Sequence, residues 1–65
     1  MIFQDSTKAL ELKEIGNQYF KQQDTNQALE YYEKALELCP SLDTGLLLIL
    51  YSNIAVCYSK HVRTY

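Results

Sequence analysis

The chain has 65 residues, a formal net charge of −2, and hydrophobic residues at 48% of its positions. A chain of this length supports one small domain at most, and such a domain buries only about 60% of its unfolded surface, so its stability is marginal. This apolar fraction argues against intrinsic disorder, and the lack of a Lys/Arg cluster argues against nucleic-acid binding.

The first predicted helix covers residues 7–22, with Ser6 or Thr7 as its N-terminal cap. Its apolar residues recur at the three- and four-residue spacing that places them on one helical face: Leu12, Ile15, Gly16, Tyr19 and Phe20. Gly16 costs about 1 kcal/mol in a helix interior relative to Ala. A glycine there predicts close approach of a neighbouring helix, because it has no side chain to hold that helix away.

The second predicted helix begins after Asp24, whose side chain caps it. It ends before Pro40, because the residue preceding a proline disfavours helical geometry. Small Ala28 and Ala35 flank the large Tyr32 on one face of this helix. That alternation lets two helices nest, so we expect the first two helices to pair antiparallel as a hairpin.

A third helix is predicted over residues 43–60, with Ser41 or Asp43 as its cap. Its segment Leu46 to Leu50 is apolar all round, which requires cover on more than one side. A strand is the alternative for so short an apolar run, but helical spacing continues through Tyr51, Ile54, Ala55 and Tyr58. We expect this helix to pack on the first one, and residues 61–65 to form a frayed tail.

The same residues form a longer pattern. Residues 12–19 read Leu-x2-Ile-Gly-x2-Tyr, residues 28–32 read Ala-x3-Tyr, and Pro40 follows. Residues 51–58 repeat the first part as Tyr-x2-Ile-Ala-x2-Tyr. The pattern resembles the tetratricopeptide repeat, a helix–turn–helix unit with the signature W-x2-L-G-x2-Y, then A-x3-F, then P. The resemblance implies an all-α fold: one antiparallel helical hairpin plus one additional helix, a fragment of an α-solenoid.

The resemblance covers about one and a half repeats. We therefore expect residues 1–65 to form a single partial domain of this type. Its parts are a first repeat at residues 7–40, the first helix of a second repeat at residues 43–60, and a tail at residues 61–65.

Two features depart from the family pattern. Gly16 and its match Ala55 are 39 positions apart, whereas the family period is 34 residues. Five extra residues near 41–47 therefore lengthen either the connecting loop or the start of the third helix. Gln23 also occupies a position where the family often has Gly in the turn between helices.

Lys13, Asn17 and Asn53 go beyond the generic repeat. They resemble residues of co-chaperones that bind the acidic C-terminal tail of cytosolic heat-shock chaperones, which ends in Glu-Glu-Val-Asp. In that subfamily a Lys and two Asn bind the terminal carboxylate, and a third repeat supplies a further Lys and Arg that this sequence does not reach. The resemblance thus implies three of five clamp residues, and a weak interaction with such a tail.

The spacing of these residues suits a shared binding site. Lys13 and Asn17 are four positions apart and lie one above the other on a helix. Phe20 lies three positions beyond Asn17, and Val56 lies three beyond Asn53, so both can contact ligand side chains near the charged end. We predict a peptide-binding site of these five residues; the alternative for its polar members is a solvated helix face without a ligand.

Cysteine and histidine usage points away from other chemistry. Cys39 and Cys57 are too few for a disulfide scaffold, and we interpret them as reduced, apolar residues of a cytoplasmic protein. Cys57 and His61 have a metal-like spacing, with Cys39 as a third ligand, but structural zinc needs four ligands. We expect no metal, no cofactor and no enzymatic activity, because no nucleophile–base–acid arrangement is present.

Two function classes remain. The first is a co-chaperone-like protein-interaction module, and the second is a structural fragment that forms a homodimer through its apolar third helix and binds no peptide. Residues 1–10 lack the features of a signal peptide. The apolar run from Leu46 to Tyr51 is far shorter than the roughly 20 residues that span a bilayer, so no membrane association is expected.

Overall fold

A computed structural model describes residues 4–62 of the chain, without the side chains of residues 61 and 62. Within this range the structure consists of three α-helices and contains no strand: α1 (Ser6–Lys21), α2 (Thr25–Leu38) and α3 (Thr44–Val62). The predicted all-α fold is confirmed, and the apolar run at Leu46–Leu50 is helical. The predicted helix ends differ from these by at most two residues.

The structure differs from the predicted tail at the first two residues of that segment. His61 and Val62 belong to α3, because the helix continues past the last residue of the repeat pattern. The remaining residues of the predicted tail, 63–65, lie outside the described residues.

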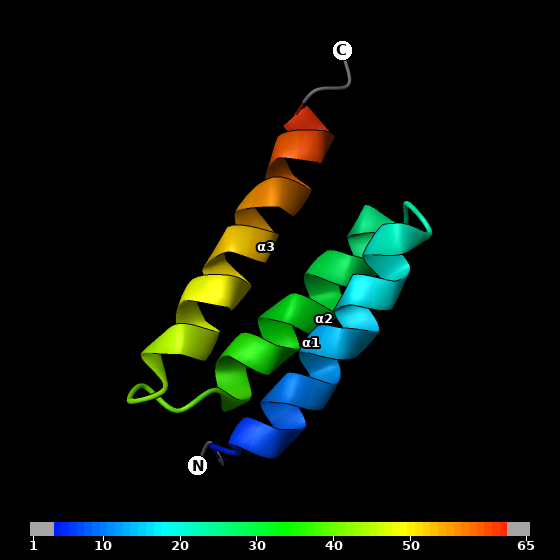
Figure 1. The fold of residues 1–65 in the computed structure, drawn as a ribbon. Coiled ribbons are helices and arrows are strands. Elements are labelled where there is room, and N and C mark those ends of the chain that lie inside the picture. Colours follow the sequence, from blue (N-terminus) through cyan, green and yellow to red (C-terminus); the bar gives the residue numbers. More distant parts are fainter. Residues whose placement is uncertain (1–3, 63–65) are drawn as a thin grey trace.

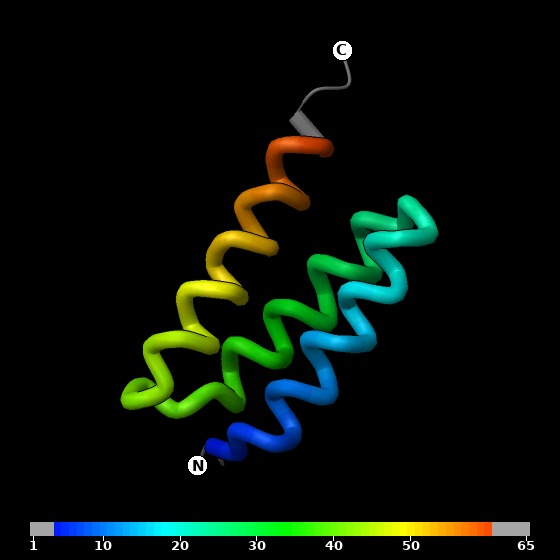
Figure 2. The backbone as a smooth tube through the Cα atoms, in the orientation of Figure 1, coloured from blue at the N-terminus to red at the C-terminus, as the bar shows by residue number. Residues whose placement is uncertain are grey.

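α1 and α2 form the predicted antiparallel hairpin, and α3 lies beside α2 and runs parallel to α1 (Figures 1 and 2). The expectation that α3 packs on α1 is wrong, since its main partner is α2. The buried side chains explain the difference, because Leu46, Leu50 and Cys57 of α3 join the core with the buried face of α2. That face consists of Ala28, Tyr32 and Ala35.

Each helix begins at an aspartate whose carboxylate accepts a hydrogen bond from the backbone N–H three residues later. The N···O distances are 3.2, 3.2 and 3.3 Å for Asp5, Asp24 and Asp43 respectively. Asp24 is therefore the predicted cap, and Asp43 is the correct one of two candidates. The prediction of a cap at Ser6 or Thr7 is wrong, because the carboxylate of Asp5 already holds the first turn.

The close helix approach predicted at Gly16 is confirmed. A Cβ atom built on Gly16 would lie 2.7 Å from Cε1 of Tyr32 and 3.2 Å from the backbone oxygen of Ala28. Tyr32 is only 2% exposed. Glycine is therefore favoured at this crossing of α1 and α2, because the tyrosine ring occupies the space that a larger side chain would fill.

The turn between α1 and α2 depends on Gln23, which has a φ of 64° and is the only described non-glycine residue with positive φ. Backbone N–H groups of Gln23 and Asp24 donate to the carbonyls of Phe20 and Tyr19, both at 2.9 Å. This left-handed conformation strains any residue with a Cβ. The physical reason for the family's frequent glycine at this position is thus visible here.

The five extra residues near positions 41–47 lengthen the third helix and not the loop before it. The connection from α2 to α3 contains only residues 39–43, and α3 is already helical from Thr44 onward. Cys39 has an extended backbone before Pro40, which ends α2 as predicted. Of the apolar segment that follows, Leu46 and Leu50 are buried, whereas Leu48 is 68% exposed.

No helix among the described residues combines the length and the apolar character needed to cross a lipid bilayer.

Candidate functional site

A pocket of about 160 Å3 opens between the three helices. It is lined by Asn17 and Phe20 of α1, Tyr32 of α2, and Asn53 and Val56 of α3. Four of the five predicted site residues therefore meet in one pocket. The spacing explains this, because Asn17 and Phe20 are three apart on α1, and Asn53 and Val56 are three apart on α3.

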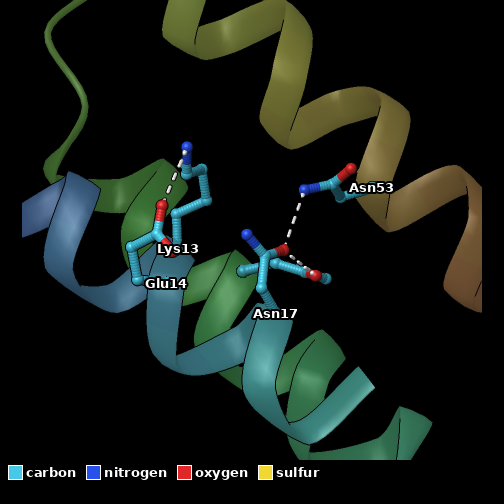
Figure 3. Close-up of polar contacts among 5 residues, drawn as sticks. Lys13, Glu14, Asn17 and Asn53 are labelled. Atoms are coloured by element: carbon cyan, nitrogen blue, oxygen red, sulfur yellow. Dashed lines mark hydrogen bonds and ion pairs between the residues drawn. The ribbon is translucent and has the colours of Figure 1, made fainter. Parts of the chain in front are cut away.

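The polar centre of the pocket is the side chain of Asn17. Its Oδ1 accepts a hydrogen bond from the Tyr32 hydroxyl at 2.5 Å and a longer one from Nδ2 of Asn53 at 3.5 Å. Figure 3 shows Asn53 reaching from α3 toward Asn17 on α1. Since two donors converge on the same oxygen, one asparagine links all three helices.

Lys13 is the predicted site residue that does not line the pocket. It lies one turn before Asn17 on the same side of α1, as Figure 3 shows. Its Nζ is 3.5 Å from Oε2 of Glu14, and the exposed fractions of the two side chains are 14% and 64%. The ammonium is thus paired with a carboxylate that is largely exposed to water.

A second cation lies at this site, although the family pattern does not make it a clamp residue. Nζ of Lys60 lies 5.0 Å from the centre of the Phe20 ring, and Phe20 lines the pocket. Lys60 is four positions after Val56 and seven after Asn53, so helical spacing places all three on one strip of α3. This spacing was the feature of the sequence that could have indicated Lys60 as a site residue. It is a weak indication, because a lysine near a helix end usually extends into solvent.

The two sides of the pocket therefore have similar chemistry. α1 contributes a cation, an amide and an aromatic ring, while α3 contributes an amide, an apolar side chain and a cation: Lys13, Asn17, Phe20, Asn53, Val56 and Lys60. Such a site suits a ligand that has a negative group and an adjacent apolar group. Its volume is below the roughly 300–1,000 Å3 of pockets for drug-sized molecules, which favours the end of a chain.

Tyr32 also was not predicted as a site residue, because its position in the repeat pattern indicates packing. Burial raises the pKa of its phenol from the ordinary value of a tyrosine, and nearby Cys57 and Glu14 raise it further. The hydroxyl therefore remains a hydrogen-bond donor at neutral pH.

Cys39 and Cys57 are free and buried, as their apolar interpretation predicts. Burial raises the pKa of both thiols; Asp43 adds to the effect at Cys39, whereas Lys60 opposes it at Cys57. Both thiols are therefore poor nucleophiles at neutral pH. Among the side chains that the structure describes, no group of three His, Cys, Asp or Glu residues is arranged for metal binding, and the side chain of His61 lies outside them.

Comparison with known proteins gives matches along most of the chain. A family model described as the tetratricopeptide repeat matches residues 9–42, which is more than half of the sequence. Protein unc-45 homolog B of Danio rerio is 35% identical over 52 residues, which cover 80% of this chain and 6% of that protein. Protein PHOX1 of Arabidopsis thaliana is 43% identical over 53 residues, which cover 82% of this chain and 7% of that protein.

A further relative is the mitochondrial import receptor subunit TOM70 of Saccharomyces cerevisiae. It is 40% identical over 50 residues, which cover 77% of this chain and 7% of that protein. The chain therefore spans less than a tenth of the length of each of these three relatives. No solved structure matches the chain at a comparable level of significance.

Proposed function

Because the chain belongs to the tetratricopeptide repeat family, whose stacked helices form binding surfaces for other proteins, we propose that it binds the acidic C-terminal end of a partner protein. The single observation that carries this proposal is the pocket in which Asn17, Phe20, Asn53 and Val56 converge from two helices. Protein–protein interaction is the general role of the family; the identity of the ligand and the site are the proposal.

The chemistry of the pocket supports a carboxylate ligand. Asparagine amides supply N–H donors. Lys13 lies one turn before Asn17 on α1, and the ammonium group of Lys60 lies over the ring of Phe20. Hydrogen bonds to charged groups are worth roughly 1.5–3 kcal/mol each. The apolar surface of Phe20 and Val56 suits the side chain that precedes a terminal carboxylate.

We propose the C-terminal tail of a cytosolic heat-shock chaperone as the partner, in line with the co-chaperones that the sequence resembles. One relative is named as a mitochondrial import receptor subunit, so a similar repeat occurs in a protein named as part of a receptor. A cytoplasmic location is part of the proposal, and the two free, buried thiols support it because disulfides are rare in that compartment.

The affinity should be modest. Residues 1–65 hold three of the five residues of the family clamp, Lys13, Asn17 and Asn53, and neither Lys60 nor Arg63 matches the other two. Binding that depends on exposed charges weakens as salt concentration rises, since the screening length is about 8 Å at physiological ionic strength.

Fluorescence anisotropy with a labelled peptide ending in Glu-Glu-Val-Asp tests the proposal. Lys13→Ala should weaken binding by about tenfold or more, because it removes one charge-assisted contact. Lys8→Ala is the matched control: its side chain is exposed on α1 and is not part of the pocket, and it changes the net charge equally. Equal binding by the wild-type chain and Lys13→Ala would contradict the clamp.

A second candidate function is self-association through α3. Its outer face has an apolar stripe of exposed residues at helical spacing: Leu48, Tyr51, Ala55 and Tyr58. The last three match Leu12, Gly16 and Tyr19 of α1, the surface on which α2 packs. α3 therefore presents a copy of a helix-binding surface, and a second copy of the chain is the proposed cover.

A further inference from the structure

We propose that two copies of the chain pair through α3 in an antiparallel orientation, with Tyr51 of each copy packed on Ala55 of the other. The inference rests on the self-association proposed above as a second function, and it adds the orientation and the register of the pair. The surface concerned is the apolar stripe of α3, which consists of Leu48, Tyr51, Ala55 and Tyr58.

The stripe lies on the side of α3 that faces away from the core. The opposite side of the helix holds Leu46, Leu50 and Cys57, which are all buried, whereas the three large side chains of the stripe are each at least half exposed. Members of the stripe are separated by three, four and three positions, which is the heptad spacing of a seam between two helices. The stripe therefore suits a partner helix that runs along α3 and not across it.

The surface of a second copy that best matches the stripe is its own stripe. The face of α2 that packs on α1 is already covered, since Ala28, Tyr32 and Ala35 are buried. On the described part of α1 the large, exposed apolar residues are Leu10 and Ile15, and a separation of five positions puts them on different sides of that helix. The stripe therefore meets its equivalent in the partner, as in any closed two-fold pair.

The sizes of the four side chains favour the antiparallel orientation. A two-fold axis midway between Tyr51 and Ala55 brings these two residues of different copies face to face, and it brings Leu48 opposite Tyr58. Two tyrosine rings then never face each other, and large and small side chains alternate across the seam so that the helices interdigitate. A parallel pair would place each residue opposite its own copy, so tyrosine rings would meet at two levels and a gap would remain at Ala55.

The hairpin of the same chain already contains a tyrosine packed on a small residue. Tyr32 of α2 lies against Gly16 of α1, where an added Cβ would be 2.7 Å from its ring. Ala55 occupies the position of α3 that matches Gly16 in the repeat pattern, so we expect it to receive the Tyr51 ring of the partner. Because Ala55 has a Cβ, the two α3 helices should lie slightly farther apart than α1 and α2.

The charges of α3 favour the same arrangement. The sequence has no charged residue between positions 44 and 59, and Lys60 lies over Phe20 on the pocket side. The stripe of one copy therefore brings no charge against that of the other. A helix is partially positive at its N-terminus and partially negative at its C-terminus, so antiparallel helices set opposite partial charges side by side.

The area of the stripe predicts a pair that dissociates on dilution. A tyrosine buries about 150–250 Å2, and the two in each stripe are about half exposed, so the four tyrosines of a pair contribute roughly 300–500 Å2 to the interface. With the smaller contributions of Leu48 and Ala55, the total stays below the roughly 1,200 Å2 at which standard interfaces begin. The mass of the wild-type chain should therefore rise with concentration.

A mixture of two charged variants tests the orientation. Leu48→Glu and Tyr58→Lys should each prevent pairing alone, because each puts a charge opposite an apolar side chain at both ends of the seam. Lysine suits position 58, since the Tyr58 hydroxyl lies 3.4 Å from a carboxylate oxygen of Glu33. Mixed in equal amounts, the variants should pair at least about tenfold more tightly than either does with itself, because one end of the seam is native again and the other holds an ion pair.

A mixture of Leu48→Glu and Leu48→Lys is the matched control. In the antiparallel pair the two substituted positions lie at opposite ends of the seam, so this mixture should stay monomeric in sedimentation velocity. A parallel pair would place the two substituted positions face to face and would rescue this mixture instead. Circular dichroism of each variant verifies that the helices are intact, which is expected because both side chains are exposed.

Ala55→Leu tests the contact with Tyr51 by the direction of its effect. In the antiparallel pair the larger side chain occupies the space of the partner's tyrosine ring, so association should weaken by about fivefold or more. In a parallel pair the same substitution would fill the gap at Ala55 and strengthen association. Ala55 is exposed in a single copy, so the fold of the chain should not change.

The outcomes separate the orientation from the self-association on which it rests. If the wild-type chain pairs but Ala55→Leu strengthens the pair, or the Leu48→Glu and Tyr58→Lys mixture is not rescued, the orientation is wrong and self-association stands. If Leu48→Glu pairs as well as the wild-type chain, the stripe is not the interface and both proposals fail. A wild-type chain that is monomeric at all concentrations also overturns both, and leaves the stripe to a partner other than a second copy.

Discussion

At the scale of single residues, aspartate side chains define where the helices of this chain begin. Asp5, Asp24 and Asp43 cap the three helices, and two of these were predictable because capping residues precede a periodic apolar pattern. Asp5 was missed because Ser6 and Thr7 are equally good caps by residue type. Asp5, Ser6 and Thr7 are consecutive, and the sequence alone does not show which of them is the last residue before the helix.

Gln23 adopts a left-handed backbone conformation that costs a residue with a Cβ roughly 1–2 kcal/mol relative to glycine. Gln23→Gly should therefore stabilise the chain, by about 0.5–1 kcal/mol after the greater entropy of glycine in the unfolded state is included. Urea denaturation followed by circular dichroism measures the change. Gln22→Gly is the control, since Gln22 has a negative φ and the substitution there should destabilise.

Also at the scale of single residues, Glu14 should lower the affinity of the site for an acidic peptide. Its exposed carboxylate is paired with Lys13 at 3.5 Å and competes with a ligand carboxylate for the ammonium. Exposed ion pairs are worth at most about 1 kcal/mol, so Glu14→Gln should raise affinity for the acidic peptide by up to about fivefold. Glu11→Gln is the control, because it changes the net charge equally from an exposed position on α1. An equal gain in peptide affinity in this variant would show that the effect of Glu14→Gln comes from net charge and not from the pair with Lys13.

At the scale of helices, the spacing of apolar residues predicted all three elements, because period and capping are properties of the sequence alone. The partner of α3 was not predictable in this way. A segment such as Leu46–Leu50 is apolar all round and has no preferred face, so only the three-dimensional arrangement shows that Leu46 and Leu50 face α2. The same limit hid Lys60, whose proximity to Phe20 depends on how α1 and α3 are placed.

The crossing of α1 and α2 supplies a prediction at this scale. Gly16→Ala should destabilise the chain by up to about 2 kcal/mol, because the cost of overpacking against Tyr32 exceeds the helix propensity gained. Gly45, at the start of α3, has nothing within 4 Å of an added Cβ, so Gly45→Ala should be neutral or stabilising. Thermal melts of the two variants compare them directly, and equal shifts would show that the Tyr32 ring can move aside.

The whole molecule is a small arrangement of three helices, with extents of 38 × 21 × 17 Å. In so small an arrangement each helix keeps a face toward solvent, and on α3 that face carries exposed apolar residues. Tyr51 and Tyr58 are 57% and 50% exposed, and Leu48 is 68% exposed. Full burial of a large apolar side chain stabilises a protein by about 1.5–3 kcal/mol, so covering this stripe would substantially raise the stability of a domain this small.

Pairing with a second copy is the simplest way to cover the stripe, since closed two-fold dimers are the commonest symmetric assembly. We expect a homodimer, or a larger even assembly, at micromolar concentration in light scattering coupled to size exclusion. Leu48→Glu should give monomers, because it places a charge within the apolar stripe that the partner would cover. Leu10→Glu is the control, as Leu10 is 46% exposed on α1 and should leave the dimer intact. A wild-type chain that is monomeric, with a cooperative melt independent of concentration, would exclude self-association and leave peptide binding as the function of the exposed surface.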